Sequence, residues 1–174
     1  MHHATLCLLI RDEPVRQVLL GLKKRGFGKD KYNGLGGKQE PSETIIDAAV
    51  RELREEADMR TTPESLTKYA ELEFRFPEVP SEKGWDQTVH VFVAYSWRGE
   101  PKETDEMRPE WIDTSKMPYS KMWEADRHWM PHVIEGKYVK ARFTYSAKQR
   151  LVQKEVNVSM EAFPQLILAA ARLL

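Results

Sequence analysis

Residues 37–59, GKQEPSETIIDAAVRELREEADM, contain the clearest helical pattern in the chain. Their apolar side chains recur three and four positions apart, which is the spacing of one helix face: Ile45, Ile46, Ala49, Val50, Leu53 and Ala57. We expect a helix from Thr44 to Ala57. Ser42 is the expected N-cap, because a serine oxygen accepts hydrogen bonds from the free N–H groups of a first turn.

Three glutamates of this helix share one sector of its surface. At about 100° per residue, Glu52, Glu55 and Glu56 fall within roughly 100° of one another and overlap the edge of the apolar face. Like charges at this spacing repel, and partial burial raises the cost unless protons or cations neutralise them. Three hard oxygen donors suit magnesium or manganese. For helices rich in glutamate and arginine in general, a solvated acidic face is the more common explanation.

The segment before the helix is basic. It carries six cations against the single carboxylate of Asp30: Lys23, Lys24, Arg25, Lys29, Lys31 and Lys38. Gly34, Gly36 and Gly37 let the backbone approach a ligand closely, although a glycine cluster is equally compatible with a turn. A basic segment followed by an acidic helix favours a magnesium-bound polyphosphate, because cations hold the phosphates while carboxylates hold the metal.

The whole chain has 174 residues, with 27 Lys+Arg against 27 Asp+Glu. This length favours one globular domain, and the zero net charge argues against a binder of nucleic-acid polymers or of membrane surfaces. Cys7 is the only cysteine, so no intramolecular disulfide is possible, and we expect it to be a small buried hydrophobe. No apolar stretch approaches the ~18 residues of a membrane-spanning helix, so a soluble, cytoplasmic protein is expected.

Outside the central helix, the sequence predicts a mixed α/β protein. Strands are expected where apolar residues cluster or alternate, at residues 4–10, 17–22, 70–76, 88–97 and 109–112. A helix is expected over residues 123–135 despite Pro131, and a hairpin over residues 138–158 around Ala147 and Lys148. Residues 164–174 favour a further, apolar helix.

Residues 37–59 also carry glycine and charged residues at fixed spacing: Gly37, Glu43, Arg51, Glu52, Glu55 and Glu56. This pattern resembles the Nudix box, the motif of hydrolases that cleave a nucleoside diphosphate linked to another moiety. One position differs, since the family usually has glycine where Asp58 stands. Glycine there suits the left-handed conformation that follows a helix, and aspartate tolerates it at a small cost in stability.

The resemblance extends from Thr5 to about Val156 and is closest to an animal subfamily of MutT homologues that hydrolyses oxidised purine nucleoside triphosphates. The runs that carry it include Val18–Gly21, Lys23–Gly28, Asn33–Gly34, Gly36–Lys38, Asp105–Pro109 and Met122–Trp123. It implies a Nudix α/β/α sandwich around a mixed β-sheet in residues 1–158. Residues 159–174 would form a C-terminal helical extension that docks on the domain or mediates dimerisation, and we expect a monomer.

The resemblance also implies a metal site. Mg²⁺, with Mn²⁺ as the alternative, would be held by the Gly36 carbonyl and by four carboxylates: Glu52, Glu55, Glu56 and Glu106. The candidate catalytic residues are Glu52, Glu56 and Glu106, with Glu52 or Glu106 accepting the proton as water attacks phosphorus. The products would be a nucleoside monophosphate and pyrophosphate. Arg51 and Glu43 are expected to support the loop and the helix by an ion pair.

The implied substrate is a purine nucleoside triphosphate, bound by residues from several segments: Thr5, Lys23, Phe27, Asn33, Leu35, Gly36, Gly37, Lys38, Phe74, Met107, Trp123 and Asp126. Lys23 would contact phosphate, Trp123 would stack on the purine and Asn33 would hydrogen-bond its edge. Phe27, Phe74 and Met107 would form the walls of the pocket. Each aromatic residue, taken alone, is more often part of a core.

Base preference depends on the residues after Trp123. In the resembling proteins two consecutive carboxylates read the base edge by exchanging protonation states, whereas here Ala125 and Asp126 stand in those positions, with Glu124 as the substitute. The expected substrates are modified purines of the 8-oxo-dGTP and 2-hydroxy-dATP type, without a preference between them. Two alternatives stay open: a Nudix hydrolase of a dinucleoside polyphosphate or nucleotide sugar, and a catalytically silent nucleotide-binding module, which Asp58 and Ala125 would suit.

Overall fold

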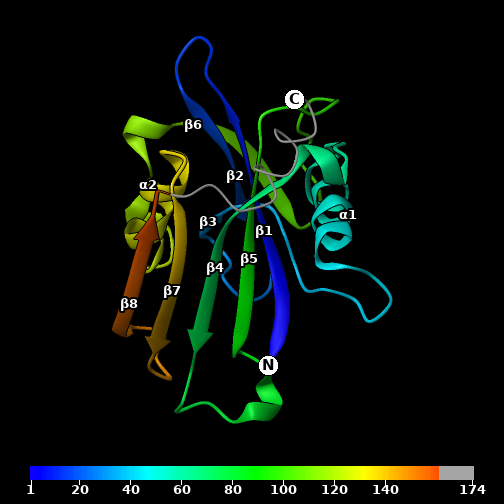
Figure 1. The fold of residues 1–174 in the computed structure, drawn as a ribbon. Helices are drawn as coiled ribbons and strands as arrows, with labels where there is room; N and C mark the ends of the chain where they lie inside the picture. Colours follow the sequence, from blue (N-terminus) through cyan, green and yellow to red (C-terminus); the bar gives the residue numbers. More distant parts are fainter. Residues whose placement is uncertain (161–174) are drawn as a thin grey trace, which may run out of the picture.

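The computed structural model describes residues 1–160, which form one mixed β-sheet with two α-helices (Figure 1). The strands are β1 (His2–Arg11), β2 (Gln17–Lys23), β3 (Tyr32–Asn33), β4 (Thr67–Arg75), β5 (Gln87–Ala94), β6 (Met107–Asp113), β7 (Tyr138–Tyr145) and β8 (Leu151–Ser159). The helices are α1 (Ile45–Ala57) and α2 (Asp126–Ile134). Short 3₁₀ helices lie at Pro63–Ser65, Ser81–Lys83, Thr114–Lys116 and Tyr119–Lys121.

The sheet has the strand order β3-β2-β1-β5-β4-β7-β8, and β6 pairs with β2 beside this path. β1 and β5 run parallel, as do β4 and β7, while the other paired strands are antiparallel. The sheet is therefore mixed, as predicted. The predicted hairpin near the end of the chain is also confirmed, with β7 and β8 as its two strands.

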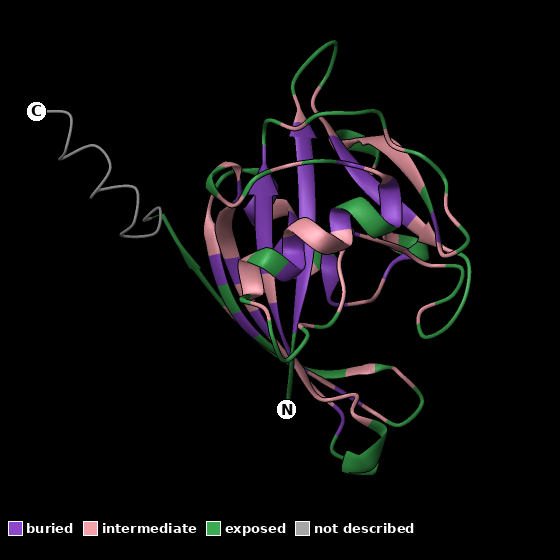
Figure 2. Ribbon diagram, turned by 90° about the vertical axis from the view of Figure 1, so that its right-hand side faces the viewer, coloured by how far each residue is buried: buried purple, intermediate pink, exposed green. Residues whose placement is uncertain are grey.

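Alternate residues of β1 face the two helices. Cys7 and Leu9 pack with the buried face of α1, whereas Leu6 and Leu8 belong to the core that contains α2. Figure 1 shows the sheet between the two helices, and Figure 2, with α1 towards the viewer, shows the buried residues concentrated in the central strands. The predicted α/β/α sandwich is confirmed. Cys7 is fully buried, as expected, and burial raises the pKa of its thiol, which disfavours the reactive thiolate.

The two strands β1 and β2 pair only at Ile10–Val18 and Arg11–Gln17 and then separate. Along the N-terminal part of β1, the backbone of residues 35–38 takes the place of β2 beside the strand. Cys7 and Leu35 exchange two backbone hydrogen bonds, and the Thr5 N–H donates to the Gly37 carbonyl at 2.8 Å. Meanwhile β2 pairs with β3 and β6. This separation places the glycine-rich segment on the central strand of the sheet, next to α1.

The N-cap of α1 is Thr44, so the prediction of Ser42 was wrong. The Thr44 hydroxyl accepts a hydrogen bond from the backbone N–H of Asp47. The sequence offers both a serine and a threonine before the apolar pattern, and either residue type caps a helix well. The choice depends on where the backbone turns, which the local sequence alone does not determine.

Two other boundaries differ from the expected ones. β5 ends at Ala94, short of residue 97, and Tyr95 is 50% exposed. α2 begins at Asp126 rather than at residue 123, because the Asp126 carboxylate accepts from the Trp123 backbone N–H and closes a turn before the helix. The predicted helix over residues 164–174 lies outside the described residues. Within residues 1–160, no helix has the length and apolar character needed to cross a membrane.

Asp58 follows α1 in the left-handed conformation, with φ 56° and ψ 26°, as predicted. Replacing it with glycine is expected to raise Tm by about 2–4 °C, because glycine adopts this conformation without a Cβ clash. The exposed ion pair with Lys102 is lost, but such pairs contribute little. Thermal unfolding followed by circular dichroism measures the shift. Asp58→Ala is the control and should lower Tm, whereas a lower Tm in the glycine variant would contradict the interpretation.

Candidate active site

Glu56 lies on the buried side of α1 and ties the helix to the glycine-rich segment. Its residue is only 4% exposed, and its carboxylate accepts a hydrogen bond of 2.8 Å from the Gly36 N–H. Glu52 lies close to Gly37, since a Cβ atom on Gly37 would come within 2.3 Å of the Glu52 Oε1 atom. Glycine at position 37 therefore allows the backbone and the Glu52 carboxylate to approach each other.

Arg51 is the centre of an ion-pair network that joins α1 to the loop before it. Its guanidinium donates to both carboxylate oxygens of Glu43, at 2.7 and 3.1 Å, which confirms the predicted pair. It also donates to Glu52 at 2.8 Å, to Glu55 at 3.0 Å and to the Lys38 carbonyl at 3.1 Å. One side chain thus fixes the loop before α1 and two of the three glutamates on the helix.

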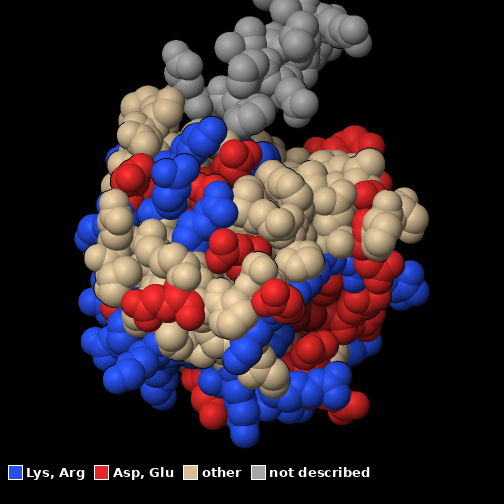
Figure 3. All heavy atoms as spheres, turned by 90° about the horizontal axis from the view of Figure 1, so that it is seen from below, with Lys and Arg blue, Asp and Glu red and all other residues tan. Residues whose placement is uncertain are grey.

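Burial and mutual repulsion disfavour the ionised forms of the innermost carboxylates. Burial raises the pKa of Glu56 to about 7, with smaller contributions from the charges of Glu52 and Glu106, against the opposing effects of the Gly36 N–H and Lys23. Burial also raises the pKa of Glu52, despite its contact with Arg51. Figure 3 shows carboxylates gathered on the side of the molecule where α1 lies, with lysines and arginines beside them.

The donor atoms of this cluster fit a divalent cation. Three carboxylate oxygens accept no hydrogen bond from residues 1–160: Glu52 Oε2, Glu55 Oε1 and Glu56 Oε1. All are hard donors, and a cation would favour the ionised form of Glu56, whose pKa is raised mainly by burial and to a smaller extent by the charges of Glu52 and Glu106. Across the described residues, no three His, Cys, Asp or Glu side chains are already gathered as a metal site. Arg51 and the Gly36 N–H each donate to the glutamates, so one oxygen of each of the three glutamates is already hydrogen-bonded.

A cavity of about 320 Å³ is lined by Gly36, Gly37 and Glu106, at the end of the sheet where β1 and β5 begin and β4 and β7 end. Glu52, Glu55 and Glu56 do not line it. Its volume lies within the range of small-molecule sites. One part is charged, with Lys23, Lys38 and Glu106, and the other part is aromatic, with Phe27, Phe74, Phe76, Trp123, Trp129 and Tyr145. A larger hollow of about 660 Å³, near Arg60 and Arg98 beyond the end of α1, contains none of the predicted site residues.

The NUDIX domain family matches residues 1–133, which include the carboxylate cluster and most of the cavity lining. The chain belongs to the Nudix family. Among its relatives, the oxidized purine nucleoside triphosphate hydrolase of Danio rerio is 41% identical over 152 residues, covering 87% of this chain and 93% of that protein. The protein of the same name from Mus musculus is 35% identical over 148 residues, covering 85% of this chain and 89% of that protein.

Solved structures support the Nudix fold. A MutT protein from Bacillus halodurans superposes with a TM-score of 0.76 over 90% of this chain and 98% of its own, at 22% identity. That likeness concerns the fold alone. The family match and the curated relatives together show that the protein is a Nudix hydrolase, and Nudix hydrolases generally use divalent metal ions.

Ten of the twelve predicted substrate-binding residues line the Nudix cavity: Thr5, Lys23, Phe27, Asn33, Gly36, Gly37, Lys38, Phe74, Trp123 and Asp126. Leu35 and Met107 do not. Both side chains are buried in the core beneath α1, and Met107 packs against Gly21, where a Cβ atom would lie 2.3 Å from its sulfur. Their positions next to lining residues in the sequence were misleading, because β-structure turns successive side chains to opposite faces.

The cavity also contains residues that the sequence analysis missed. Phe76 directly follows β4 and continues the alternation of Leu72 and Phe74, so the period-2 pattern was sufficient to find it. Tyr145 and Trp129 come from β7 and α2, and only the tertiary fold brings them to this end of the sheet. Glu124 does not face the cavity. It pairs with Arg150 at 2.9 Å and accepts from the Leu151 N–H, so the expectation that it reads the base was wrong.

Asp126 is the buried carboxylate of the aromatic part. Its two oxygens accept from the Trp129 Nε1–H at 3.0 Å and from the Trp123 N–H at 3.1 Å. Burial is the largest cause that raises its pKa, to about 7 from 3.8, and the two hydrogen bonds and Lys31 oppose the shift. A carboxyl group that titrates near neutral pH can donate or accept at a ligand edge, depending on its protonation.

This pKa predicts a pH dependence of stability. The folded chain keeps the Asp126 proton up to about pH 7, whereas the unfolded chain loses it near 3.8, so the free energy of unfolding should fall as the pH rises between these values. Asp126→Asn should flatten this part of the profile. Urea denaturation at several pH values measures the free energy of unfolding of both proteins. Glu56 contributes equally to the two profiles, so the difference between them reports Asp126. An unchanged slope in the variant would contradict the shifted pKa.

Proposed function

We propose that this Nudix hydrolase converts oxidised or otherwise modified purine nucleoside triphosphates, such as 8-oxo-dGTP and 2-hydroxy-dATP, into the monophosphate and pyrophosphate. One observation carries the proposal: a single cavity combines aromatic side chains with Lys23, Lys38 and Glu106, and its lining residue Gly36 donates a hydrogen bond to the buried Glu56. The aromatic part suits a purine, and the charged part suits a triphosphate with a divalent cation. The names of the zebrafish and mouse relatives support this substrate class.

Mg²⁺ is the proposed ion, with Mn²⁺ as the alternative. Its proposed ligands are the free oxygens of Glu52, Glu55 and Glu56, together with Glu106 and the Gly36 carbonyl. When bound, such an ion neutralises phosphate charge and lowers the pKa of water. Water then adds across the anhydride between the α- and β-phosphates, and the bridging oxygen leaves with one of the two phosphates.

The protein side chains position the phosphates and accept a proton. Lys23 and Lys38 line the charged part of the cavity, where their ammonium groups suit a polyphosphate. The Lys23 Nζ atom also lies 3.9 Å from Glu106, which keeps this carboxylate near the phosphate region. Glu52 and Glu106 are the two candidate bases for the attacking water. Because both are also proposed ligands of the ion, kcat of Glu52→Gln and of Glu106→Gln is compared at saturating Mg²⁺, and the variant with the larger loss identifies the base.

A product screen tests the proposed reaction. Modified and unmodified purine triphosphates, a dinucleoside polyphosphate and a nucleotide sugar are incubated with the protein and Mg²⁺, and the products are separated by ion-exchange chromatography. We expect a monophosphate and pyrophosphate from the modified purine triphosphates. Preferential cleavage of the dinucleoside polyphosphate or the nucleotide sugar would replace the proposal with another Nudix substrate. Turnover of none would favour a silent nucleotide-binding module.

Three further expectations belong to the same proposal. The protein acts as a monomer in the cytoplasm, and a buried, unpaired Cys7 suits such a reducing compartment. Residues 1–158 are the proposed catalytic domain, and the proposed extension over residues 159–174 lies almost entirely outside the described residues. Light scattering of the full chain and of a chain ending at residue 158 measures the mass in solution. A dimer that disappears on truncation would assign the extension to dimerisation.

A further inference from the structure

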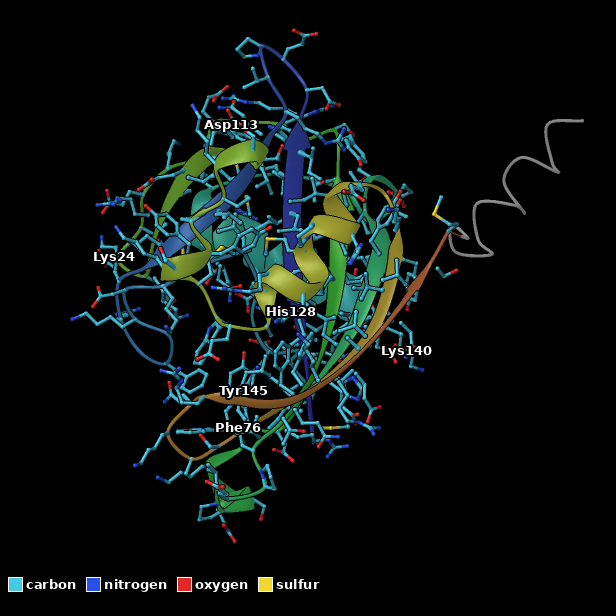
Figure 4. The ribbon with its side chains drawn as sticks, turned by 90° about the vertical axis from the view of Figure 1, so that its left-hand side faces the viewer. Lys24, Phe76, Asp113, His128, Lys140 and Tyr145 are labelled. Carbon is cyan, nitrogen blue, oxygen red and sulfur yellow. The ribbon has the colours of Figure 1, made fainter. Side chains whose placement is uncertain are left out.

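Tyr145, the last residue of β7, presents a polar atom inside the aromatic part of the cavity. The residue is 1% exposed and lines the cavity. Its ring stacks on Phe76, with centroids 5.4 Å apart and planes 20° apart, and meets the edge of Trp123 at 5.9 Å. Figure 4 shows the labelled Tyr145 and Phe76 close together at this end of the sheet. The ring has little freedom, so the position of its hydroxyl is fixed.

The hydroxyl has an unused hydrogen. Its oxygen accepts a hydrogen bond of 3.0 Å from the Ala125 N–H. Because that backbone group is the donor, the O–H hydrogen of Tyr145 must find another acceptor. Residues 1–160 offer no such acceptor within hydrogen-bond distance. A buried donor without a partner is unfavourable, so a ligand atom that accepts this hydrogen would gain a full hydrogen bond.

The other polar side chains near Tyr145 are more constrained. The Asn33 Oδ1 atom accepts from the Gly34 N–H, which leaves its amide N–H groups for a ligand. Both oxygens of Asp126 already accept from fixed donors, and its protonation varies near neutral pH. Burial raises the pKa of Tyr145, so its hydroxyl keeps the proton over the whole physiological range. Tyr145 is therefore a donor whose character does not change with pH.

We propose that Tyr145 is a base-binding residue that donates its hydroxyl hydrogen to an acceptor on the purine and thereby sets the preference among modified bases. This inference rests on the proposed function. The acceptor is a carbonyl oxygen or an unprotonated ring nitrogen. Such atoms distinguish modified purines, because oxidation at C8 adds a carbonyl and converts N7 from an acceptor into an N–H donor. A fixed donor at one place on the base edge therefore discriminates between these purines.

The variant Tyr145→Phe removes the hydroxyl and keeps the ring. The matched control is Tyr95→Phe, which removes the hydroxyl of a tyrosine that is 50% exposed and does not line the cavity. We expect kcat/KM of Tyr145→Phe to fall about tenfold for one or more of 8-oxo-dGTP, 8-oxo-dATP, 2-hydroxy-dATP and dGTP, and less than about twofold for the others. Tyr95→Phe should behave as wild type with all four.

Two results would overturn the inference. Equal losses with all four substrates would mean that the hydroxyl maintains the shape of the cavity, and losses below about twofold with all four would mean that it contacts no base. Isothermal titration calorimetry with the four corresponding monophosphates tests whether the hydroxyl contacts the base, independently of hydrolysis. If the wild type hydrolyses none of the triphosphates, the proposed function fails. Weaker binding of some monophosphates by Tyr145→Phe would still support the hydroxyl as a donor, and unchanged binding would reject it.

Discussion

Replacing Glu56 with glutamine is expected to lower kcat by about 1,000-fold without lowering the stability of the metal-free protein. Glu56 is buried, and one of its oxygens is free for a cation. Glutamine keeps an oxygen that can accept from the Gly36 N–H but removes the charge. Because burial raises the pKa of Glu56 to about 7, its ionised form destabilises the fold above that pH. The variant should therefore be at least as stable as wild type at pH 8.

Pyrophosphate release and thermal unfolding, each with and without Mg²⁺, measure the two effects. Mg²⁺ should raise the Tm of the wild type and leave that of Glu56→Gln unchanged. The matched control is Glu40→Gln, since Glu40 is an exposed carboxylate just before α1 and outside the cluster. It should keep wild-type activity and the wild-type response to Mg²⁺. Activity of Glu56→Gln within about tenfold of wild type would contradict the assigned metal site.

The second large effect is expected for Gly36→Ala, which should lower the free energy of unfolding by about 3 kcal/mol and abolish activity. A Cβ atom on Gly36 would lie 2.1 Å from the Thr5 carbonyl oxygen and 2.9 Å from the Leu6 Cα. Both are backbone atoms of the central strand β1, so no side-chain rotation relieves the clash. The segment must move away from β1, and the Gly36 N–H then loses its bond to Glu56.

Urea denaturation and pyrophosphate release measure these losses, with Gly136→Ala as the control. Gly136 has φ 82°, and a Cβ atom there meets nothing within 4 Å, so only backbone strain is expected, at about 1 kcal/mol. Gly136 does not line the cavity, and its variant should remain active. Equal stability of Gly36→Ala and wild type would show that residues 35–38 do not pack against β1 as described.

Much of the fold follows from local patterns in the sequence. The 3.6-residue period gave α1 its place and its buried face, and the alternation in β4 and β5 gave two central strands. Boundaries were less predictable, as the N-cap at Thr44 shows, because several residues near a terminus have similar capping ability. The separation of β1 from β2 was not predicted at all. It depends on backbone pairing between residues far apart in the chain.

The candidate site divides in the same way. Glu52, Glu55 and Glu56 share a helix face, so their grouping was predictable from their spacing. The ion pair of Arg51 with Glu43 was predictable from the family resemblance. Tyr145 was not found, because nothing in its own segment indicates that the end of β7 meets Trp123 and Phe76. Leu35 and Met107 were wrongly placed in the cavity. Neighbouring residues in the sequence face opposite sides of the sheet, and the motif alone does not indicate which side is buried.

The most direct test of the proposed function is the ratio of kcat/KM for 8-oxo-dGTP to that for dGTP, measured with Mg²⁺. The two substrates carry the same triphosphate and sugar, so the ratio isolates the contribution of the aromatic part of the cavity. A preference of at least about tenfold for 8-oxo-dGTP, with the monophosphate and pyrophosphate as products, is the predicted result. Equal values for 8-oxo-dGTP, 2-hydroxy-dATP and dGTP would contradict a role in removing modified purine nucleotides.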